Sequence, residues 1–462
     1  PLIVFPSLTL KCYARKDSSI IENTKGIYYP TDFKWEGQGG KVTWERAGFH
    51  PDSVYAILNN YILNIKFSYY DADSITFFNK NYFEHPLIGK ISEKIMADVK
   101  TEDDARYPRF VSYVNRFKIN NLFENVDYDG GFALNGGQFI GRGSDEEDAY
   151  LIFKSKYVLG IANSKSYIIE RDRIISQNAG ITFYFEKDSI YHPKMELKYF
   201  DKDKSLGLYR ERLSTPIFDS YHKLDIYTEA IYWKLNEPRL VFSKTKGINP
   251  ESEAYMESAN YFDLNRFEKI QGLSNTNPLF KIRDFCRDMK SNYFHVKDFA
   301  IYNKSQLQGT KTLLLNLADL GFLFYNSSND IVTVNDKLVF YCNARIARTD
   351  YDVIKFHSRI SKHDQDNAVL NLLNFDLRLT GIQQILLSDS QNVTIKPRNS
   401  EIVVKKNRDF VFSGHVNTSN FTFFGDDFYF DYDNFKIVFT KEVAMGITVP
   451  SKEKDEYGYF KR

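Results

Sequence analysis

The segment from Asp409 to Phe439 restricts the fold of this chain more than any other. It reads DFVFSGHVNTSNFTFFGDDFYFDYDNFKIVF, and aromatic residues recur at every second position, as in Phe421 and Phe423 or Phe428 and Phe430. Successive side chains of a strand point to opposite faces of a sheet, so this spacing predicts β-strands with one aromatic, buried face.

Two other segments, Phe33 to Trp44 and Tyr128 to Gly143, share this pattern of alternating aromatic runs interrupted by glycine. Aromatic residues make up 16% of the chain, a proportion that favours β structure. The repeated pattern predicts blocks of short, glycine-turned strands in an elongated β-solenoid-like or stacked-sheet array. Three unrelated hairpins that contain glycine are the alternative.

A different pattern follows residue 292. An apolar helix is expected over Thr310 to Leu320, with Gly321 as the residue that ends it. Phe322 to Tyr325 and Ile331 to Val334 then flank a polar turn, which indicates a hairpin. Helix, turn, helix and hairpin in this order predict a small α/β module of the winged-helix type.

Changes in pattern divide the chain into five parts. The segments Glu251 to Asn260 and Phe280 to Met289 lack alternation, and both are expected to be helical or irregular. The predicted parts are β block 1 (1–120), β block 2 (121–245), a mixed helical connector (246–292), the winged-helix-like module (293–350) and β block 3 (351–462).

Charge and cysteine content exclude several classes of protein. The 61 Lys and Arg residues nearly balance 60 Asp and Glu residues, which argues against a nucleic-acid-binding protein. The apolar helix of the module also lacks base-reading side chains, so we expect the module to dock a partner or act as a spacer.

No apolar stretch is long enough to cross a bilayer. Three cysteines form no disulfide framework, and both chain ends are interpreted as cuts in a longer protein.

Motifs that carry chemistry are scarce. The eight histidines include no pair at the spacing of a zinc-binding helix, and no nucleophile elbow or Walker loop occurs. Cys286 and Cys342 lie in apolar surroundings, where thiols are usually inert. Gly136 and Gly137 are interpreted as turn residues. The sequence therefore predicts no catalytic residue, no metal ligand and no cofactor.

Acidic residues offer one alternative. Asp426, Asp427, Asp431 and Asp433 lie in the last aromatic segment, and an acidic run spans 145–148. Asp431 and Asp433, two positions apart, are expected to share a strand face. The favoured interpretation is a solvated edge that discourages strand pairing. Paired carboxylates could instead bind Ca²⁺ or act as acid and base in a polysaccharide lyase or hydrolase on a β-helix.

Seven blocks of the sequence carry a resemblance to known proteins: TKGIYYP (24–30), GGKVTWERAG (39–48), ADSITF (72–77), DSIYHP (188–193), PIFDSYHKLDIY (216–227), LSDSQNV (387–393) and KKNRDFVFSG (405–414). They resemble a family of very large, uncharacterised Bacteroidota cell-envelope proteins. The resemblance covers most of the chain, as an internal piece of such a protein. It implies an exported, β-rich protein in the periplasm or on the cell surface, and it implies no particular activity.

Three tripeptides agree with export. They resemble the Asp-Ser/Thr-aliphatic acceptor for O-glycosylation in that phylum, and their serines are Ser53, Ser74 and Ser189. A glycan at such a site would be exposed and solubilising. The alternative is chance, because so short a pattern recurs in many chains.

These observations lead to one favoured function. The chain is expected to be a non-enzymatic cell-envelope scaffold or binding protein that presents a β-rich surface to a glycan, lipid or protein partner. One alternative is the polysaccharide lyase or hydrolase described above. Another is lipid conveyance along an apolar β groove, by analogy of fold with bacterial bridge-like lipid-transfer proteins. An exposed line of apolar side chains on one concave face would mark such a groove.

Overall fold

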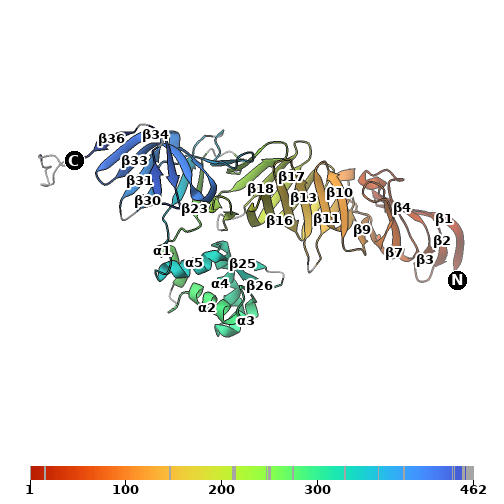
Figure 1. Cartoon of the computed structure of the whole chain (residues 1–462). Coiled ribbons are helices and arrows are strands. Elements are labelled where there is room, and N and C mark those ends of the chain that lie inside the picture. The colour runs from red at the N-terminus through yellow and green to blue at the C-terminus, as the bar shows by residue number, and fades with distance from the viewer. Residues whose placement is uncertain are drawn as a thin grey trace. The chain divides into compact units, whose positions relative to one another are not determined.

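Antiparallel β structure dominates the chain, and its α-helices lie in one insertion (Figure 1). The computed structural model describes residues 2–14, 17–144, 147–210, 215–245, 247, 251–272, 275–326, 329–362, 364–388, 391–439, 441, 443–449 and 453. The described chain divides into two compact units. Unit 1 comprises 1–155, 159–181 and 196–206, and unit 2 comprises 156–158, 182–195 and 207–462. The predicted mainly β class with a small helical insertion is confirmed, while the five-part division stays a prediction.

Unit 1 is built from antiparallel strands. Its central strands are β7, which pairs with β5 and β8, and β11, which pairs with β9, β10, β12 and β13. The strands are β1 (Ile3–Ala14), β2 (Asp17–Tyr29), β3 (Lys34–Gln38), β4 (Lys41–Thr43), β5 (Val54–Ile57), β6 (Asn60–Asn64), β7 (Tyr69–Asn79), β8 (Leu87–Lys94), β9 (Arg109–Ser112), β10 (Phe117–Phe123), β11 (Val126–Asn135), β12 (Gln138–Arg142), β13 (Ala149–Lys154), β14 (Leu159–Ser164) and β15 (Ser166–Ile169).

Aromatic rings fill the core of unit 1. Phe77 of β7 stacks on Phe110 of β9 with ring centroids 4.0 Å apart, and Phe132 of β11 packs beside both. These three side chains are at most 3% exposed. The rings close over Gly89 of the intervening strand β8, where a Cβ atom would lie 2.6 Å from the Phe110 ring. Glycine within a strand thus makes room for a neighbouring ring.

Glycines in the Tyr128 to Gly143 segment serve two purposes. Gly136 has φ +54° in the turn that joins β11 to β12, which confirms the predicted turn. Gly141 instead lies inside β12, beneath the ring of Tyr128, and a Cβ atom there would come within 2.8 Å of that ring. The alternation of aromatic residues and glycines therefore reflects packing as well as chain reversal.

The strands of unit 2 confirm the strongest alternation in the sequence in part, because Phe421 of β34, which was expected on the buried face, is 42% exposed. Phe410 and Phe412 of β33 pair with Phe430 and Phe428 of β34, and all four side chains are at most 3% exposed. Strands β16 (Arg173–Phe185), β17 (Asp188–Phe200) and β18 (Ser205–Tyr209) have residues in both units. The other strands of unit 2, outside its helical insertion, are β19 (Ile217–Asp219), β20 (Leu224–Tyr227), β21 (Ala230–Lys234), β22 (Arg239–Ser243), β23 (Ser252–Ser258), β27 (Lys355–Ile360), β28 (Ala368–Asn371), β29 (Leu377–Thr380), β30 (Ile385–Ser388), β31 (Val393–Pro397), β32 (Glu401–Val404), β33 (Phe410–Thr418), β34 (Phe421–Asp431), β35 (Lys436–Val438) and β36 (Ala444–Ile447).

The insertion, residues 264–345, is termed the helical module. Its strands form a separate three-stranded sheet in the order β24, β26, β25. The elements α3, α4, β25 and β26 follow one another in the predicted order of helix, turn, helix and hairpin, whereas α2 and β24 were not part of the predicted module. Gly321 follows α4 with φ +78°, as predicted. The elements are α1 (Leu264–Gln271), α2 (Pro278–Met289), β24 (Tyr293–His295), α3 (Val296–Tyr302), α4 (Leu307–Asp319), β25 (Leu323–Asn326), β26 (Ile331–Val334) and α5 (Asp336–Arg345).

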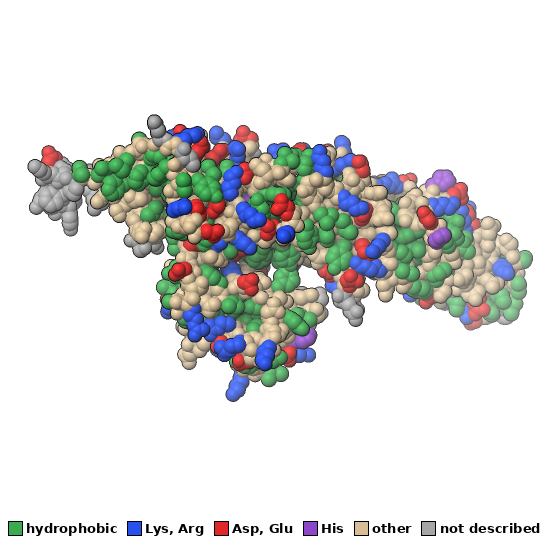
Figure 2. Space-filling model, viewed as in Figure 1, with side chains coloured by type: hydrophobic (Ala, Val, Ile, Leu, Met, Phe, Trp, Pro, Cys, Tyr) green, Lys and Arg blue, Asp and Glu red, His purple; other side chains and the backbone are tan. Residues whose placement is uncertain are grey.

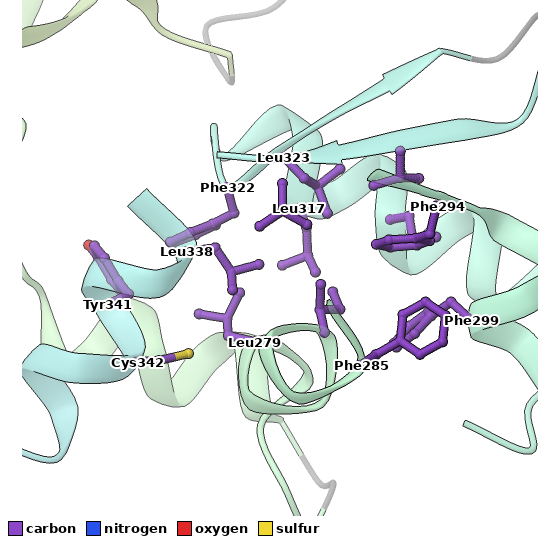
Figure 3. Close-up of a cluster of buried hydrophobic side chains, with 14 of the residues drawn as sticks. Leu279, Phe285, Phe294, Phe299, Leu317, Phe322, Leu323, Leu338, Tyr341 and Cys342 are labelled. Atoms are coloured by element: carbon purple, nitrogen blue, oxygen red, sulfur yellow. The ribbon is translucent and has the colours of Figure 1, made fainter. Parts of the chain in front are cut away.

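The module has its own core. Leu279 of α2, Leu317 of α4 and Leu338 of α5 point toward one another in Figure 3, while Phe285 of α2 packs on Phe299 of α3, and these side chains are at most 4% exposed. The predicted apolar helix therefore faces inward on one side, which is the usual arrangement of an amphipathic helix on a small core.

One expectation is wrong. The segment Glu251 to Asn260, expected to be helical or irregular, contains strand β23. Its inward face carries Ser252, Ala254 and Met256, and its outward face includes the equally buried Glu257. Small and polar residues on both faces conceal the period of two by which strands are recognised.

The surface is mixed in charge. On the face seen in Figure 2, basic and acidic side chains are interspersed. Among the described residues, no helix has the length and apolar character needed to cross a bilayer.

Candidate functional site

A cleft of about 550 Å³ opens on the outer face of the unit 2 sheet. Its volume falls within the range of small-ligand sites in proteins. The lining residues come from β16, β17, β19 and β20, from the turn between β19 and β20, and from the residue after β23: Thr182, Tyr184, Ser189, Tyr191, Phe218, Asp219, Ser220, Lys223, Leu224, Asp225 and Ala259.

Strand alternation places the aromatic residues of the cleft. In β16, Phe183 is fully buried while Tyr184 is 47% exposed. In β17, Ile190 is 1% exposed and Tyr191 faces outward beside it. The rings of Tyr191 and Phe218 stack across β17 and β19, with centroids 6.3 Å apart and planes 20° apart. An apolar inner residue thus fixes each outward ring.

The register extends this pair into a row across the sheet. Tyr191 lies opposite Phe218, Phe218 opposite Asp225, Asp225 opposite Glu257, and Glu257 opposite Lys355. The row changes from aromatic to acidic to basic along one line of the outer face. Neighbours in such a row interact directly, so the aromatic end of the row is a surface prepared for apolar or ring-shaped contacts.

The helical module lies over the charged part of the row. Arg266 of α1 donates two hydrogen bonds to the Glu257 carboxylate, at 2.7 and 2.9 Å. Lys355 lies 3.2 Å from the same carboxylate, and Lys337 of α5 pairs with Asp225. Burial opposes ionisation of Glu257, but Arg266 and the nearby lysines outweigh it and lower the pKa of this carboxyl. These ion pairs attach the module to the sheet beside the cleft.

Apolar contacts complete that attachment. The rings of Phe324 in β25 and Tyr191 lie 6.1 Å apart. Gly321 packs on Pro216 and Phe218, and a Cβ atom at Gly321 would meet the Pro216 ring at 3.1 Å. The module therefore supports the aromatic pair that lines the cleft.

A buried dyad supports the cleft from below. His222 donates from Nδ1 to Asp219, at 2.6 Å, and from Nε2 to the carbonyl oxygen of Phe375, at 2.9 Å. Asp219 also accepts the backbone N–H groups of Tyr221 and His222. Burial opposes a charge on His222, yet the Asp219 carboxylate raises its pKa above the usual value. Both ring nitrogens of His222 are therefore engaged in hydrogen bonds, and neither is free to take up a substrate proton or a metal ion.

Lys223 is the one exposed cation of the cleft lining. Its backbone is in the left-handed region, with φ +56°, and its carbonyl oxygen accepts a hydrogen bond from Ala259. Among the described residues no acid pairs with its ammonium group, whereas Asp225 is paired with Lys337 and Asp219 with His222. The cleft therefore presents one uncompensated positive charge.

The predicted glycan-attachment serines lie in different surroundings. Ser53 is half-buried in the turn before β5, and Ser74 is exposed at a bulge in β7 with φ +50°. Ser189 lines the cleft, and its backbone N–H donates to Ser220 Oγ at 2.9 Å. The structure brings none of these serines together.

The acidic residues do not converge either. Asp426 pairs with Arg398, Asp427 with Lys441, and Asp431 with Lys436, while Asp433 accepts a hydrogen bond from Asn407. Strand β34 ends at Asp431, so Asp433 lies in the turn that follows and the two carboxylates do not share a strand face. No cluster of potential metal ligands occurs among the described residues. Asp145 and Glu146 of the other acidic run lie outside the described residues.

The thiols are poorly suited to nucleophilic attack. Burial raises the pKa of Cys286 to about 11 and of Cys342 to about 12. Both thiols therefore stay protonated at neutral pH.

Sequence reasoning missed the cleft, although two resembling blocks build it. DSIYHP supplies Ser189 and Tyr191, and PIFDSYHKLDIY supplies Phe218 to Asp225. Strand alternation in each block would have indicated the outward aromatic side chains. Their pairing across β17 and β19 has no signal in a single sequence. No family model, no curated protein and no solved structure matches this chain, so the argument for function depends on the residues themselves.

Proposed function

We propose that this chain is a non-enzymatic binding protein of the cell envelope whose unit 2 cleft binds a glycan. The observation that carries the proposal is the combination of Tyr184, Tyr191 and Phe218 with hydroxyl groups and one free lysine in a single open cleft. Sugar rings have apolar faces and hydroxyl rims, and aromatic surfaces with nearby polar groups complement both.

The cleft chemistry favours a glycan over the other expected partners. A peptide that adds a strand needs free backbone groups at a sheet edge. Here the ligand would lie over the faces of β17, β19 and β20, whose backbones already pair with one another or with β23. An acyl chain needs a shielded apolar groove, whereas this cleft is open and is lined by Lys223 and Asp225.

The same residues argue against catalysis in this cleft. General acid–base chemistry needs a carboxyl or imidazole group that can exchange a proton with the substrate. The two carboxylates of the lining, Asp219 and Asp225, are held by His222 and Lys337. The paired acid residues near the C-terminus, on which the lyase or hydrolase alternative depends, are each held by a separate partner.

Packing within each unit also bears on lipid conveyance. The inward aromatic side chains, such as Phe77 and Phe110 in unit 1 and Phe183 and Trp233 in unit 2, contact one another and are at most 1% exposed. A lipid-conveying apolar groove along the interior of either unit would need the space that these aromatic side chains fill. The binding proposal is therefore better supported than conveyance.

Lys223 indicates the charge of the glycan. With the lining acids already paired, an anionic sugar would meet an unopposed ammonium group, and surface charges of this kind contribute modest, salt-dependent affinity. We expect a uronic-acid oligosaccharide to bind more tightly than a neutral one of equal length.

Isothermal titration calorimetry with the whole chain tests the proposal. Oligogalacturonate and a neutral glucan oligosaccharide of the same length serve as probes. The variant Tyr191→Ala/Phe218→Ala is expected to lose binding of both, because the aromatic surface is removed. The variant Lys223→Gln is expected to lose only the preference for the acidic probe.

A matched control keeps the result specific. Tyr293 is 63% exposed on the helical module and does not line the cleft, so Tyr293→Ala should bind like the unsubstituted chain. Failure of both probes to bind, or equal loss in the Tyr293 variant, would overturn the glycan proposal.

Export and glycosylation belong to the same proposal. The resemblance to envelope proteins supports a location in the periplasm or on the cell surface, and Ser74 is exposed enough to carry a glycan. Intact-mass measurement of the chain purified from a Bacteroidota host should show added hexose mass, and Ser74→Ala should remove part of it. An unmodified mass would contradict glycosylation without affecting the cleft.

A further inference from the structure

Unit 1 contains a second, smaller site. A cavity of about 70 Å³ lies among β1, β2, β6, β7 and β8 and the segment between β6 and β7. Its solvent-facing end carries Ile65, Phe67 and Tyr69, which are 53%, 56% and 56% exposed. Ser19, Tyr70 and Glu93 also line it and are nearly buried. The cavity is thus apolar toward solvent and polar at depth.

Two hydroxyl groups in this cavity are incompletely satisfied. Ser19 is 7% and Tyr70 9% exposed, and neither Ser19 Oγ nor Tyr70 OH makes a hydrogen bond of normal geometry among the described residues. Ser19 lies near enough to Tyr70 and Glu93 to lower the pKa of both groups, but burial outweighs this effect. A buried hydroxyl without a partner destabilises a protein, so such groups are rare unless a ligand or water completes them. The space beside them is large enough for a small polar group.

Glu93 adds a carboxyl group to the same cavity. It is 3% exposed, pairs with Arg46 and accepts the backbone N–H of Lys94 at 2.9 Å. Arg46 is shared with Asp17, which lies 3.0 Å from the guanidinium, so one cation serves two buried acids. The cavity therefore favours a ligand that brings a proton or a positive charge, and disfavours an added negative charge.

The titratable groups that face the cavity agree with this electrostatic picture. Burial raises the pKa of Glu93 to about 7, although Arg46 opposes this shift. Burial also raises the pKa of the Cys12 thiol and of the Tyr70 phenol, so both stay uncharged at neutral pH. Arg46 and Asp17 already pair with each other.

We propose that this cavity binds an aliphatic ligand head first, with a non-anionic head that donates a hydrogen bond. An alcohol or a primary amine would donate to Glu93 and satisfy the hydroxyl groups of Ser19 and Tyr70. Its chain would lie against Leu63, Ile65 and Phe67 toward solvent. A carboxylate head of the same chain length would meet Glu93 and be repelled. This inference is independent of the glycan cleft, because it concerns only residues of unit 1.

Three probes of equal chain length test the proposal on the whole chain: 1-octanol, octylamine and octanoate, by isothermal titration calorimetry at pH 8. We expect the alcohol and the amine to bind, and octanoate to bind at least about tenfold more weakly, as expected for one unfavourable charge contact. Equal binding of octanoate, or no binding of the alcohol and the amine, would overturn the proposal.

Two conservative variants separate the site from the fold. Tyr70→Phe should weaken 1-octanol binding about tenfold without lowering the melting temperature, because it removes a hydroxyl group that the fold does not use. Tyr61→Phe is the control. The Tyr61 hydroxyl lies 2.7 Å from Thr24 Oγ1 and accepts from Trp35 Nε1, and Tyr61 does not line the cavity. This variant should lower the melting temperature and leave binding unchanged. Unchanged octanol affinity in Tyr70→Phe would contradict the proposed head-group contact.

Discussion

Glu257 in unit 2 and Glu93 in unit 1 are both buried carboxyl groups beside an arginine, yet their surroundings differ. Glu257 receives two hydrogen bonds from Arg266 and a lysine contact besides, and its pKa is lowered. Glu93 shares Arg46 with a second acid, and its pKa is raised to about 7. The first carboxylate is fully compensated and serves attachment of the helical module. The second is undercompensated and lines a cavity.

The hydroxyl groups around the two carboxyl groups follow the same contrast. Near Glu257, the hydroxyl group of Tyr341 accepts a hydrogen bond from the same arginine, Arg266, at 3.4 Å. In the Glu93 cavity, neither Ser19 Oγ nor Tyr70 OH makes a hydrogen bond of normal geometry, although Ser19 lies beside both Tyr70 and Glu93. Complete satisfaction of a buried polar cluster indicates a structural joint, whereas incomplete satisfaction indicates room for a ligand.

The largest expected effect on stability concerns the buried ion pair between Glu257 and Arg266. Arg266→Met leaves Glu257 buried without its bidentate partner, and removal of one member of a buried pair costs about 3–5 kcal/mol. Urea unfolding of unit 2, followed by hydrogen exchange of β23 and α1, measures this loss. A decrease in the free energy of unfolding below about 1 kcal/mol would show that Lys355 and Lys337 alone compensate the charge of Glu257. The difference between Glu257 and Glu93 would then not depend on Arg266.

The next effect depends on pH. The pKa of Glu93 is raised from its ordinary value of 4.5 to about 7 in the folded chain, so its contribution to stability is complete below pH 4.5 and is lost as pH rises through about 7. The shift corresponds to about 3 kcal/mol between pH 4 and pH 8. Urea unfolding of the unsubstituted chain and of Glu93→Gln across this range should show the difference.

The opposite shift of Glu257 provides the control for this experiment. Its pKa is lowered, so its contribution to stability is present above the unfolded value and is lost only at more acidic pH. Glu257→Gln should therefore shift stability almost equally at pH 6 and pH 8. If the free energy of unfolding of the Glu93 and Glu257 variants changed in the same way between pH 6 and pH 8, the raised pKa of Glu93 would be contradicted.

A smaller effect on stability is expected from the two tyrosine hydroxyl groups, of which only that of Tyr61 makes hydrogen bonds of normal geometry in the fold. Tyr61→Phe should destabilise unit 1 by about 1 kcal/mol, since its hydroxyl group contacts Thr24 and Trp35. Tyr70→Phe should be neutral or stabilising. Thermal unfolding without ligand measures both, and a loss in Tyr70→Phe equal to that in Tyr61→Phe would show that Tyr70 has a partner in the fold.

The smallest effect is expected at the surface. Arg359 pairs with Glu253 at 3.0 Å, but their side chains are 56% and 65% exposed. Such pairs contribute about 0–1 kcal/mol, so Arg359→Ala should change urea unfolding far less than Arg266→Met. If both variants lost a similar free energy of unfolding, burial would not explain why the Arg266 pair stabilises the fold more than the Arg359 pair.

Particular residues show how far the sequence predicts this structure. Phe410 and Phe412 alternate in a pattern that only a strand satisfies, and Gly321 follows an apolar run as helix-ending glycines do; both predictions are confirmed. Strand β23 was missed because Ser252, Ala254 and Glu257 conceal its period.

The candidate sites were beyond prediction for a different reason. Tyr191 and Phe218 come from strands whose pairing is set by the tertiary structure, and Arg46 meets Asp17 and Glu93 only after three distant segments fold together. Local patterns indicate which side chains point outward or inward, but not which of them become neighbours across strands.

Hydrogen–deuterium exchange of the whole chain with and without saturating oligogalacturonate tests the central proposal most directly. We expect slower exchange in residues 182–191 and 217–225, no change in the helical module around Tyr293, and loss of the protection in Tyr191→Ala/Phe218→Ala. Unchanged exchange in those two segments under conditions where the oligosaccharide binds, or protection elsewhere in the chain, would contradict the assignment of the unit 2 cleft as the glycan site.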